Sequence, residues 1–400
     1  MSLFTHLEMA PRDPILGISE QFNADPNPAK VNLGVGMYFD DNGKLPVLAC
    51  VATAEKQLLQ VPKSKGYLPI DGIAAYDKAV QGLVFGPDHA LLKAARVATV
   101  QALGGTGGLK VGADLLKLIK PGAVALISDP TWDNHRGIFA GAGFDVQAYP
   151  YYDPHTRAVR FEAMLAALQN APVGSVAVLH ACCHNPTGCD LSPEQWDQVV
   201  KACQSAQLVP FLDMAYQGFG DGINEDAVAL RRFIDSGMDL FIATSFSKNF
   251  SLYGERAGAL SVVCSSADDC QRVLSQLKIV IRTNYSTPPT FGATVVATVL
   301  NTPELRAQWE EELAGMRERV RSTRETLAAR LRAAGVSSDL SYITRQKGMF
   351  SYSGLTVSQM QRLRNEFGVY GLDSGRICVA AINSRNMEAV VAALAKVMTS

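Results

Sequence analysis

Polar groups that can act on a carbonyl compound stand just beyond apolar runs of the chain. Lys248 follows the run Leu240–Thr244 through a Ser-Phe-Ser segment. Asn185 follows the run AVLHACC, and the run LVPFLDMAY carries Asp213 and Tyr216. Such runs are typical of buried strands, and in open α/β sheets ligands bind beyond the carboxyl ends of the strands. An amine, a carboxylate, an amide and a phenol at one sheet edge suit an aldehyde cofactor held as a Schiff base.

Each of these residues also has a purely structural interpretation. Lys248 alone reads as a surface lysine, Asp213 as the cap of a turn or helix, and Asn185-Pro186-Thr187-Gly188 as a turn. The remaining candidates have similar alternatives: core packing for Tyr216, a loop anchor for Trp132 and a salt-bridged surface residue for Arg256. Their joint occurrence at strand ends, in this order, favours the site.

A glycine-rich segment, Gly104 to Gly108, follows the run VATVQAL and opens a helical pattern. Glycines let the backbone approach an anion, and a helix N-terminus supplies free N–H groups. The segment matches neither GxGxxG nor GxxxxGK[ST], so it is a weak candidate for a dinucleotide or P-loop site. A tight turn with close helix–strand packing is the structural alternative. We predict a phosphate-binding segment.

Composition indicates a globular enzyme of roughly two domains, at about 150 residues each. Hydrophobic residues make up 48% of the 400 residues, and 37 basic against 38 acidic side chains give a net charge of -1. This balance offers no basic surface for nucleic acid or membrane. The N-terminal residues lack the pattern of a signal peptide, and no apolar run approaches the ~18 residues of a membrane span. We expect a cytoplasmic protein that binds small molecules.

The eight cysteines do not form a disulfide scaffold in so long a chain, and no CxxC pair occurs. The densest cluster is Cys182-Cys183-His184, with Cys189 shortly after. A zinc site is the alternative here, but a second pair of ligands at usable spacing is missing. We predict buried free thiols, a reducing compartment and no metal.

Short apolar runs alternate with amphipathic stretches from about residue 97 to 264. The runs are VATVQAL, AVALISDP, VAVLHACC, LVPFLDMAY, LFIATSF and ALSVVCS. In SPEQWDQVVKACQSA, Ser192 is a predicted N-cap, Pro193 the first helical residue and Gln195 the partner in a capping box. The alternation predicts an α/β fold with a mostly parallel sheet between helices.

The pattern changes beyond residue 302. Thr302-Pro303 opens a helix of about 30 residues, long enough to bridge two domains. Its apolar face comprises Leu305, Trp309, Leu313, Met316, Val320, Leu327 and Leu331. The strand-like pieces GMFSYSG and RICVAAIN and two helices follow. The predicted division is an N-terminal arm with part of the small domain (1–44), a large cofactor-binding domain (45–302), and the bridging helix with a smaller α+β domain (303–400). We expect the arm to lie across the small domain or a partner subunit.

Motifs along essentially the whole chain resemble those of the fold-type I pyridoxal-phosphate enzymes, specifically the class I aminotransferases of the aspartate/aromatic branch. The segments are APRDPILG, VNLGVGMY, KGYLPIDG, HNPTG, DMAYQGF, SFSKNFSLYGERAG, IRTNYSTPP, QKGMFSYSGL and SGRICVA. The resemblance implies a seven-stranded, mostly parallel sheet with a smaller α+β domain. It also implies pyridoxal 5'-phosphate as cofactor and a homodimer with shared active sites.

The resemblance implies a role for each cofactor-contacting residue. Lys248 would form the Schiff base and then move the proton between substrate Cα and cofactor C4′. Asp213, supported by His135, would keep the pyridinium nitrogen protonated. Asn185 and Tyr216 would bond the phenolic oxygen. The other contacts would be Trp132 stacked on the ring and Gly105, Thr106, Ser245 and Arg256 around the phosphate.

The resemblance also implies how substrate is held. Arg376 in SGRICVA would take the α-carboxylate, and Arg282 in IRTNYS would take a distal carboxylate. Arg282 and Tyr67 would serve the neighbouring subunit's site, with Tyr67 contacting the cofactor. Gly36 would lie on the arm segment that closes over the substrate. Trp132 and Asn185 would contact the substrate as well as the cofactor.

Local residue choices favour aromatic substrates. Pro69 in GYLPIDG, Gly220 in YQGFGDG, the FSLYGERAG run and the stretch from QKGMFSYSGL to FGVY look like bacterial tyrosine aminotransferases. An unpaired Arg282 beneath an aromatic ring would be costly. Enzymes of this branch are thought to swing that arginine out to solvent. We predict ping-pong transfer from Phe, Tyr or Trp, and also Asp or Glu, to 2-oxoglutarate. An aspartate aminotransferase with little aromatic activity is the alternative.

Three further functions are rivals. A lyase or decarboxylase on the same scaffold would not need two carboxylate-binding arginines. A transcription regulator would carry a DNA-binding domain, but no basic helix-turn-helix segment precedes the fold. A nicotinamide dehydrogenase would need a fingerprint loop with an acidic residue about 20 positions on.

Overall fold

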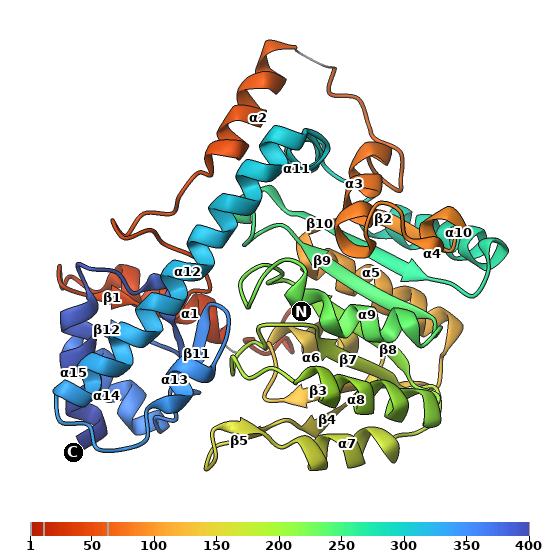
Figure 1. Cartoon of the computed structure of the whole chain (residues 1–400). Coiled ribbons are helices and arrows are strands. Elements are labelled where there is room, and N and C mark those ends of the chain that lie inside the picture. The colour runs from red at the N-terminus through yellow and green to blue at the C-terminus, as the bar shows by residue number, and fades with distance from the viewer. Residues whose placement is uncertain (1, 11–12, 62–63, 400) are drawn as a thin grey trace.

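The computed structural model describes residues 2–10, 13–61 and 64–399. Pro11 and Arg12 of the APRDPILG motif lie outside these residues. A seven-stranded sheet with helices on both faces forms the larger part of the molecule (Figure 1). Its strands, in spatial order, are β2 (Val97–Leu103), β10 (Ala257–Val263), β9 (Leu240–Ser245), β8 (Val209–Met214), β7 (Val176–His180), β3 (Val124–Asp129) and β4 (Asp145–Pro150). Strand β10 is antiparallel to both neighbours, and the other adjacent pairs are parallel. The predicted fold class is confirmed.

The central strands are apolar because both of their faces are covered. Every residue of β7, β9 and β10 is buried, as expected of strands between two helical layers. The edge strand β4 is different, since its sequence DVQAYP is largely exposed. It has no apolar run, and the sequence did not predict it.

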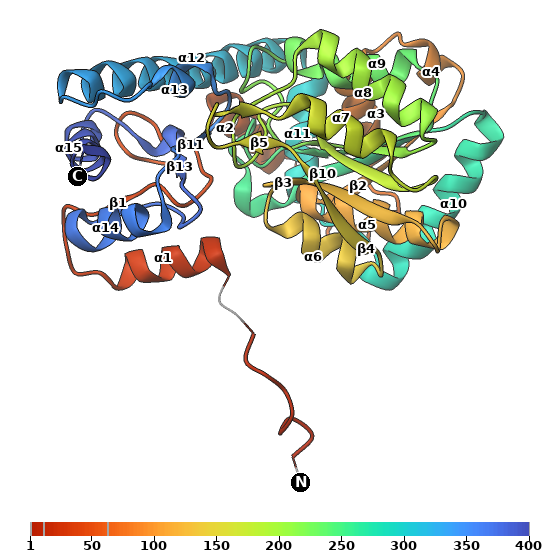
Figure 2. The same ribbon diagram turned by 90° about the horizontal axis from the view of Figure 1, so that it is seen from below.

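The helices form a layer on each face of the sheet (Figure 2). One layer consists of α5 (Gly104–Ile119), α6 (Asn134–Gly141) and α10 (Ala267–Asn284). The other consists of α3 (Ala74–Phe85), α7 (Phe161–Gln169), α8 (Pro193–Ser205), α9 (Val228–Asp235) and α11 (Phe291–Asn301). Helix α8 begins with the predicted capping box, in which Ser192 and Gln195 bond each other's backbone N–H.

Helix α12 (Pro303–Ala333) runs from the sheet layers to a smaller group of elements (Figure 1). All the apolar residues predicted for its inner face are buried. The smaller group contains α1 (Pro14–Ala24), β1 (Val31–Asn32), α13 (Ser341–Arg345), β11 (Phe350–Tyr352), α14 (Val357–Phe367), β12 (Val369–Tyr370), β13 (Arg376–Cys378) and α15 (Met387–Thr399). Strand β1 pairs in parallel with β12, so this part of the arm lies against the smaller group.

The remaining elements complete the fold. They are α2 (Ala49–Gln60), α4 (Ala90–Lys93), the paired strands β5 (Tyr152–Asp153) and β6 (Ala158–Val159), and the 3₁₀ turns η1 (Glu225–Ala227), η2 (Tyr253–Glu255) and η3 (Val379–Ala381). Within the described ranges, no helix is both long and apolar enough to span a bilayer. All eight cysteines are free thiols, and all but Cys189 are buried. The prediction of free thiols is confirmed.

Candidate active site

The carboxyl ends of β7, β8 and β9 meet the N-terminus of α5 around one cavity. Most of the predicted site residues line it: Gly105, Thr106, Trp132, Asn185, Asp213, Tyr216, Ser245, Lys248 and Arg256. Leu109, His180, Ala215 and Ser247 complete the lining. The parallel direction of β7, β8 and β9 brings these residues together, because it places their C-terminal ends at one sheet edge.

Lys248 is a partly buried amine beside a phenol ring. It follows the last residue of β9 by three positions, and its Nζ lies 5.1 Å from the centre of the Tyr216 ring. Burial lowers the pKa of Lys248 from 10.5 to about 8, and the nearby Asp213 opposes that change. A lysine with so low a pKa carries a substantial fraction of neutral, nucleophilic amine near neutral pH.

The lowered pKa predicts how the empty protein reacts with an aldehyde. Only the neutral amine attacks, so the rate at which the cofactor-free protein takes up a phosphorylated aldehyde should rise with pH around a midpoint of about 8. The measurement is stopped-flow absorbance between pH 6 and 10. The control is an N-acetyl-lysine amide, whose ordinary pKa of about 10.4 predicts a much later rise. A midpoint equal to that of the free amine would contradict the burial argument.

Asp213 is a buried carboxylate with one oxygen engaged and one without a partner. Its Oδ2 lies 3.0 Å from His135 Nε2, and His135 Nδ1 lies 2.8 Å from Thr131 Oγ1. Its Oδ1 is buried and has no hydrogen-bond partner in the described residues. Burial acts to raise the pKa of Asp213, but the His135 contact and nearby cations hold it below its usual value. The site therefore presents a charged oxygen that lacks a donor.

His180 is the main cavity residue that the sequence reasoning missed. It is the last residue of β7, and its buried Nε2 has no partner among the described residues. Its ring centre lies 4.9 Å from that of His135 and 4.3 Å from that of His184. Burial, followed by the neighbouring histidines, lowers its pKa well below 6.5 and keeps it neutral. The signal was its position at a strand end, as for Asn185 and Asp213.

The glycine-rich segment forms the first turn of α5 rather than a separate loop. Gly104 has φ +67°, and a Cβ there would lie 2.6 Å from Arg256 Nη2. A Cβ on Gly105 would lie 3.1 Å from Ser245 Cβ. Only glycine lets the turn approach these side chains so closely. First-turn N–H groups, a hydroxyl and a guanidinium together form a site suited to a phosphate.

A hydrogen-bonded chain links the cavity to the arm. Asn185 Nδ2 donates to Tyr216 Oη at 3.4 Å, and Asn185 Oδ1 accepts from Arg376 Nη1 at 3.1 Å. Arg376 is buried, and its Nη2 donates to the carbonyl of Gly34 at 2.7 Å. Burial lowers the pKa of Arg376 and raises that of Tyr216. The structure thus joins residues far apart in sequence.

Four predicted site residues do not line the cavity of this chain: Gly36, Tyr67, Arg282 and Arg376. Arg376 is hydrogen-bonded to Asn185, which does line it. Gly36 packs against the Phe350 ring, which would lie 2.7 Å from a Cβ at that position. Tyr67 is 97% exposed, and Arg282 is exposed on α10 with a hydrogen bond to Ser286 Oγ. The assignment of Tyr67 and Arg282 to a neighbouring subunit stays a prediction.

Two buried clusters have the side chains of metal sites. In the first, atoms of His135, His180 and Asp213 lie within 4.8 Å of one another. In the second, atoms of Cys182, Cys183 and Asp226 lie within 4.8 Å of one another. The Asp226 carboxylate is already engaged, because it accepts hydrogen bonds from three backbone N–H groups. Both ring nitrogens of His184 are engaged by hydroxyls, so it does not extend the cysteine cluster. The prediction of no metal stays a prediction.

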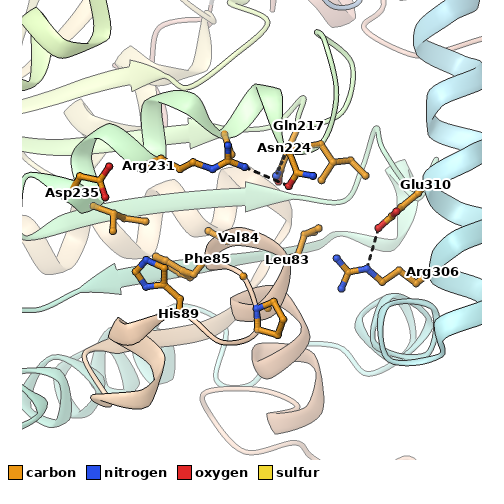
Figure 3. Close-up of a pocket in the computed structure, with 16 residues that line it drawn as sticks. Leu83, Val84, Phe85, His89, Gln217, Asn224, Arg231, Asp235, Arg306 and Glu310 are labelled. Carbon is orange, nitrogen blue, oxygen red and sulfur yellow. Dashed lines mark hydrogen bonds and ion pairs between the residues drawn. The ribbon is translucent and has the colours of Figure 1, made fainter. Parts of the chain in front are cut away.

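A larger cavity of about 360 Å³ lies between the end of α3, α9 and α12 (Figure 3). Three of its charged groups have partners: Arg231 Nη2 bonds Asn224 Oδ1 at 3.4 Å, and Arg306 Nε bonds Glu310 Oε1 at 3.1 Å. No buried polar atom without a partner lies in its lining, as far as the described residues go. Size alone does not make it an active site, and the chemistry lies at the strand ends.

The residues at the strand ends fit pyridoxal phosphate. The free oxygen of Asp213 matches a protonated ring nitrogen, and Lys248 supplies the amine for the aldehyde. The first turn of α5 matches the phosphate, and the Trp132 indole borders the space between them. When bound, the cofactor supplies an electron sink that stabilises negative charge at a substrate carbon.

Comparisons with known proteins agree with this fit. A family model described as "Aminotransferase class I and II" matches residues 28–394. The aspartate aminotransferase of Pseudomonas aeruginosa is 56% identical over 100% of both chains. The aromatic-amino-acid aminotransferase of Escherichia coli K12 is 49% identical over 99% of this chain and 100% of that protein.

Comparison with solved structures also finds aminotransferases. The crystal structure of an aromatic-amino-acid aminotransferase from Burkholderia pseudomallei, covalently bound to pyridoxal phosphate, is 58% identical over 100% of both chains, with a TM-score of 0.97. The similar proteins thus divide between aspartate and aromatic names. The chain belongs to the class I and II aminotransferases, in the pyridoxal-phosphate-dependent aspartate/aromatic branch.

Proposed function

We propose that this protein is an aromatic-amino-acid aminotransferase that also accepts aspartate or glutamate, with 2-oxoglutarate as acceptor. The observation that carries the proposal is the contrast between its two candidate carboxylate-binding arginines. Arg376 is 1% exposed and held by two hydrogen bonds, whereas Arg282 is exposed and, among the described residues, bonded only to Ser286. An exposed arginine can turn toward a distal carboxylate or away from an aromatic ring with little desolvation cost.

Lys248 and Asp213 have different tasks in this proposal. Lys248 holds the cofactor covalently and then carries the proton between the substrate Cα and the cofactor, since a pKa of about 8 lets its amine both accept and release a proton near neutral pH. Asp213 keeps the ring nitrogen protonated through its unpartnered oxygen, and His135 fixes the orientation of the carboxylate. Asn185 and Tyr216 bond the phenolic oxygen.

The remaining residues position the cofactor and the substrate. Arg376 takes the α-carboxylate of every substrate, because its guanidinium can bond both carboxylate oxygens. Arg282, from the neighbouring subunit, takes the distal carboxylate of aspartate, glutamate or 2-oxoglutarate. Gly36 lies on the arm segment that closes over the bound substrate. The phosphate is held by Gly105, Thr106, Ser245 and Arg256, Trp132 stacks on the ring, and Tyr67 of the neighbouring subunit contacts the cofactor.

Exposed apolar residues support a homodimer. Leu3, Phe4, Leu7 and Met9 are 69–96% exposed on an N-terminal segment that stands away from the body (Figure 2). A cluster of exposed apolar side chains on one segment favours contact with a partner. The exposure of Tyr67 has the same explanation. A dimer would complete each site with residues from both chains.

The proposed division of the chain follows the sequence prediction. We propose that residues 1–44 and 303–400 form the small domain with the arm and bridging helix, and that residues 45–302 form the large domain. The packing of α12 along both groups supports this division. The free thiols support the predicted cytoplasmic location.

A panel of amino donors with 2-oxoglutarate tests the substrate proposal. We expect kcat/KM for phenylalanine to lie within about a hundredfold of that for aspartate. An aspartate preference beyond a hundredfold, about 2.7 kcal/mol, would reject the aromatic assignment in favour of an aspartate aminotransferase. The matched variant is Arg282→Leu, which should lower kcat/KM for aspartate by about a hundredfold, because charge-assisted bonds contribute roughly 1.5–3 kcal/mol each. Phenylalanine should be nearly unaffected.

A further inference from the structure

Arg324 on α12 is a buried cation that bonds only the main chain. It is 3% exposed, and no ion pair is found for it in the described residues. Its Nη1 donates to the carbonyl of Ile343 at 3.0 Å, and its Nη2 donates to those of Gly348, at 2.8 Å, and Phe350. Its Nε has no partner in the described structure.

Burying the Arg324 guanidinium costs free energy, so its presence here suggests a specific role. Burial lowers the pKa of Arg324 to about 10. Removing a charge from water without an opposite charge costs several kcal/mol before hydrogen bonds offset it. A methionine of similar length would fill the space without that cost. The specific advantage of arginine is a planar group with five N–H donors, which can bond carbonyls of separate turns at once.

The carbonyls that Arg324 holds belong to a segment, residues 343–350, that ends in the wall of the substrate site. The Phe350 ring lies against the Arg376 guanidinium, with 4.4 Å between the guanidinium carbon and the ring centre. The same ring meets the Tyr216 ring edge-on, with centres 5.9 Å apart. It also contacts Gly36, where a Cβ would lie 2.7 Å from the ring.

Segment 343–350 also contacts the turn that carries Asn185. The Lys347 N–H donates to the carbonyl of Gly188 at 2.7 Å. A Cβ on Gly188 would lie 2.9 Å from the Phe350 carbonyl oxygen, so these backbones pack directly. Asn185 in turn accepts a hydrogen bond from Arg376. Segment 343–350 thus contacts Arg376 directly, through Phe350, and is linked to it again through the Asn185 turn.

We propose that Arg324 is a positioning residue for the α-carboxylate site. By holding the carbonyls of Gly348 and Phe350, it fixes the Phe350 ring against Arg376 and so sets the orientation of that guanidinium. Bidentate recognition of a carboxylate needs such control, because binding groups must be held within about 0.5 Å and 10–20° of the productive geometry. The proposal rests on the role of Arg376 given under the proposed function.

The test compares Arg324→Met, Arg324→Lys and the control Arg321→Met as holoenzymes. Arg321 lies on the exposed side of α12, and its ion pair with Glu318 spans 3.4 Å. KM is measured separately for the amino acid and for 2-oxoglutarate. Arg324→Met should raise both KM values by about tenfold, since both substrates present an α-carboxylate and small misplacements of binding groups have large effects. The kcat of Arg324→Met should change little. The KM values of Arg324→Lys should lie between those of the wild type and Arg324→Met, and those of Arg321→Met should match the wild type.

The KM values distinguish a positioning role of Arg324 from a role in stability alone. A loss of folded protein lowers the number of active sites, counted by bound cofactor, but leaves the KM of the remaining sites unchanged. Unchanged KM values in a folded Arg324→Met protein would overturn the proposal, as would equal changes in Arg321→Met.

If Arg324→Met does not fold, Arg324→Lys and Phe350→Leu carry the test. Phe350→Leu removes the ring and leaves Arg324 intact, so it should raise both KM values in the same way. In the double variant Arg324→Lys/Phe350→Leu the two effects should not add, because both act through one contact. Full additivity would overturn the proposal.

Arg376→Met separates this inference from the proposed function. Unchanged KM values in Arg376→Met would reject the role of Arg376 itself. Raised KM values there, together with wild-type values in Arg324→Met, would reject only the positioning role of Arg324.

Discussion

Replacing Lys248 with alanine is expected to lower turnover by about 10⁴-fold, the upper range for a positioned proton-transfer group. The variant should still fold and hold the cofactor, because the phosphate site at the start of α5 does not involve Lys248. What it loses is the covalent attachment and the base next to the substrate carbon. The measurement is the single-turnover absorbance change on mixing the holoprotein with an amino acid.

The matched control is Lys201→Ala, which removes an exposed lysine on α8 and should leave turnover unchanged. Borohydride reduction followed by peptide mapping gives an independent readout. The wild type should carry the pyridoxyl label on Lys248, and the Lys248→Ala protein should carry none. A label on another lysine, or a half-reaction at the wild-type rate in Lys248→Ala, would disprove the central assignment.

Replacing Asp213 with alanine should lower kcat by about 10³-fold, since removing one partner of a buried charge pair costs roughly 3–5 kcal/mol and each decade of rate is about 1.36 kcal/mol. Under the proposed function, the free Oδ1 of Asp213 would stabilise a protonated ring nitrogen, and a buried ring without it should lose its proton. Steady-state kinetics with saturating substrates and cofactor measures the effect.

A cofactor analogue methylated on the ring nitrogen provides the control for Asp213. The methyl group fixes the positive charge, so it no longer depends on a carboxylate, and the smaller alanine leaves room for it. Asp213→Ala should recover part of its activity with this analogue. An unchanged kcat in Asp213→Ala with the ordinary cofactor would remove the electrostatic role of Asp213 from the mechanism.

The residues at the sheet edge could be predicted from the sequence because the pattern that marks them is local. Each central strand is a continuous apolar run, and polar residues follow directly, so Lys248, Asp213 and Asn185 could be placed at neighbouring strand ends. The start of helix α1 also has a local signal. Asp13 caps it and Pro14 is its first residue, a typical start pattern.

Contacts between distant segments could not be predicted from residue patterns. The bond from Arg376 to Asn185 joins positions 191 residues apart, and only family resemblance suggested that both serve one site. Phe350 could not be predicted for the same reason, because it looks like an ordinary core residue until its neighbours are known. The proposed roles of Tyr67 and Arg282 in a neighbouring subunit come from family resemblance, since no residue pattern indicates them.

The unbroken length of α12 has a mechanical consequence. At 31 residues and about 1.5 Å per residue, the helix is a stiff rod that joins the two ends of the reaction site. Near its start, the Trp309 indole N–H is bonded to the carbonyl of Asn249, the residue after Lys248, at 2.7 Å. Near its end, Arg324 is hydrogen-bonded to the carbonyls of Gly348 and Phe350, in the segment that packs against Arg376. Helix α12 therefore connects the backbone beside Lys248 to the segment beside Arg376, so a rigid shift of the helix would displace both together.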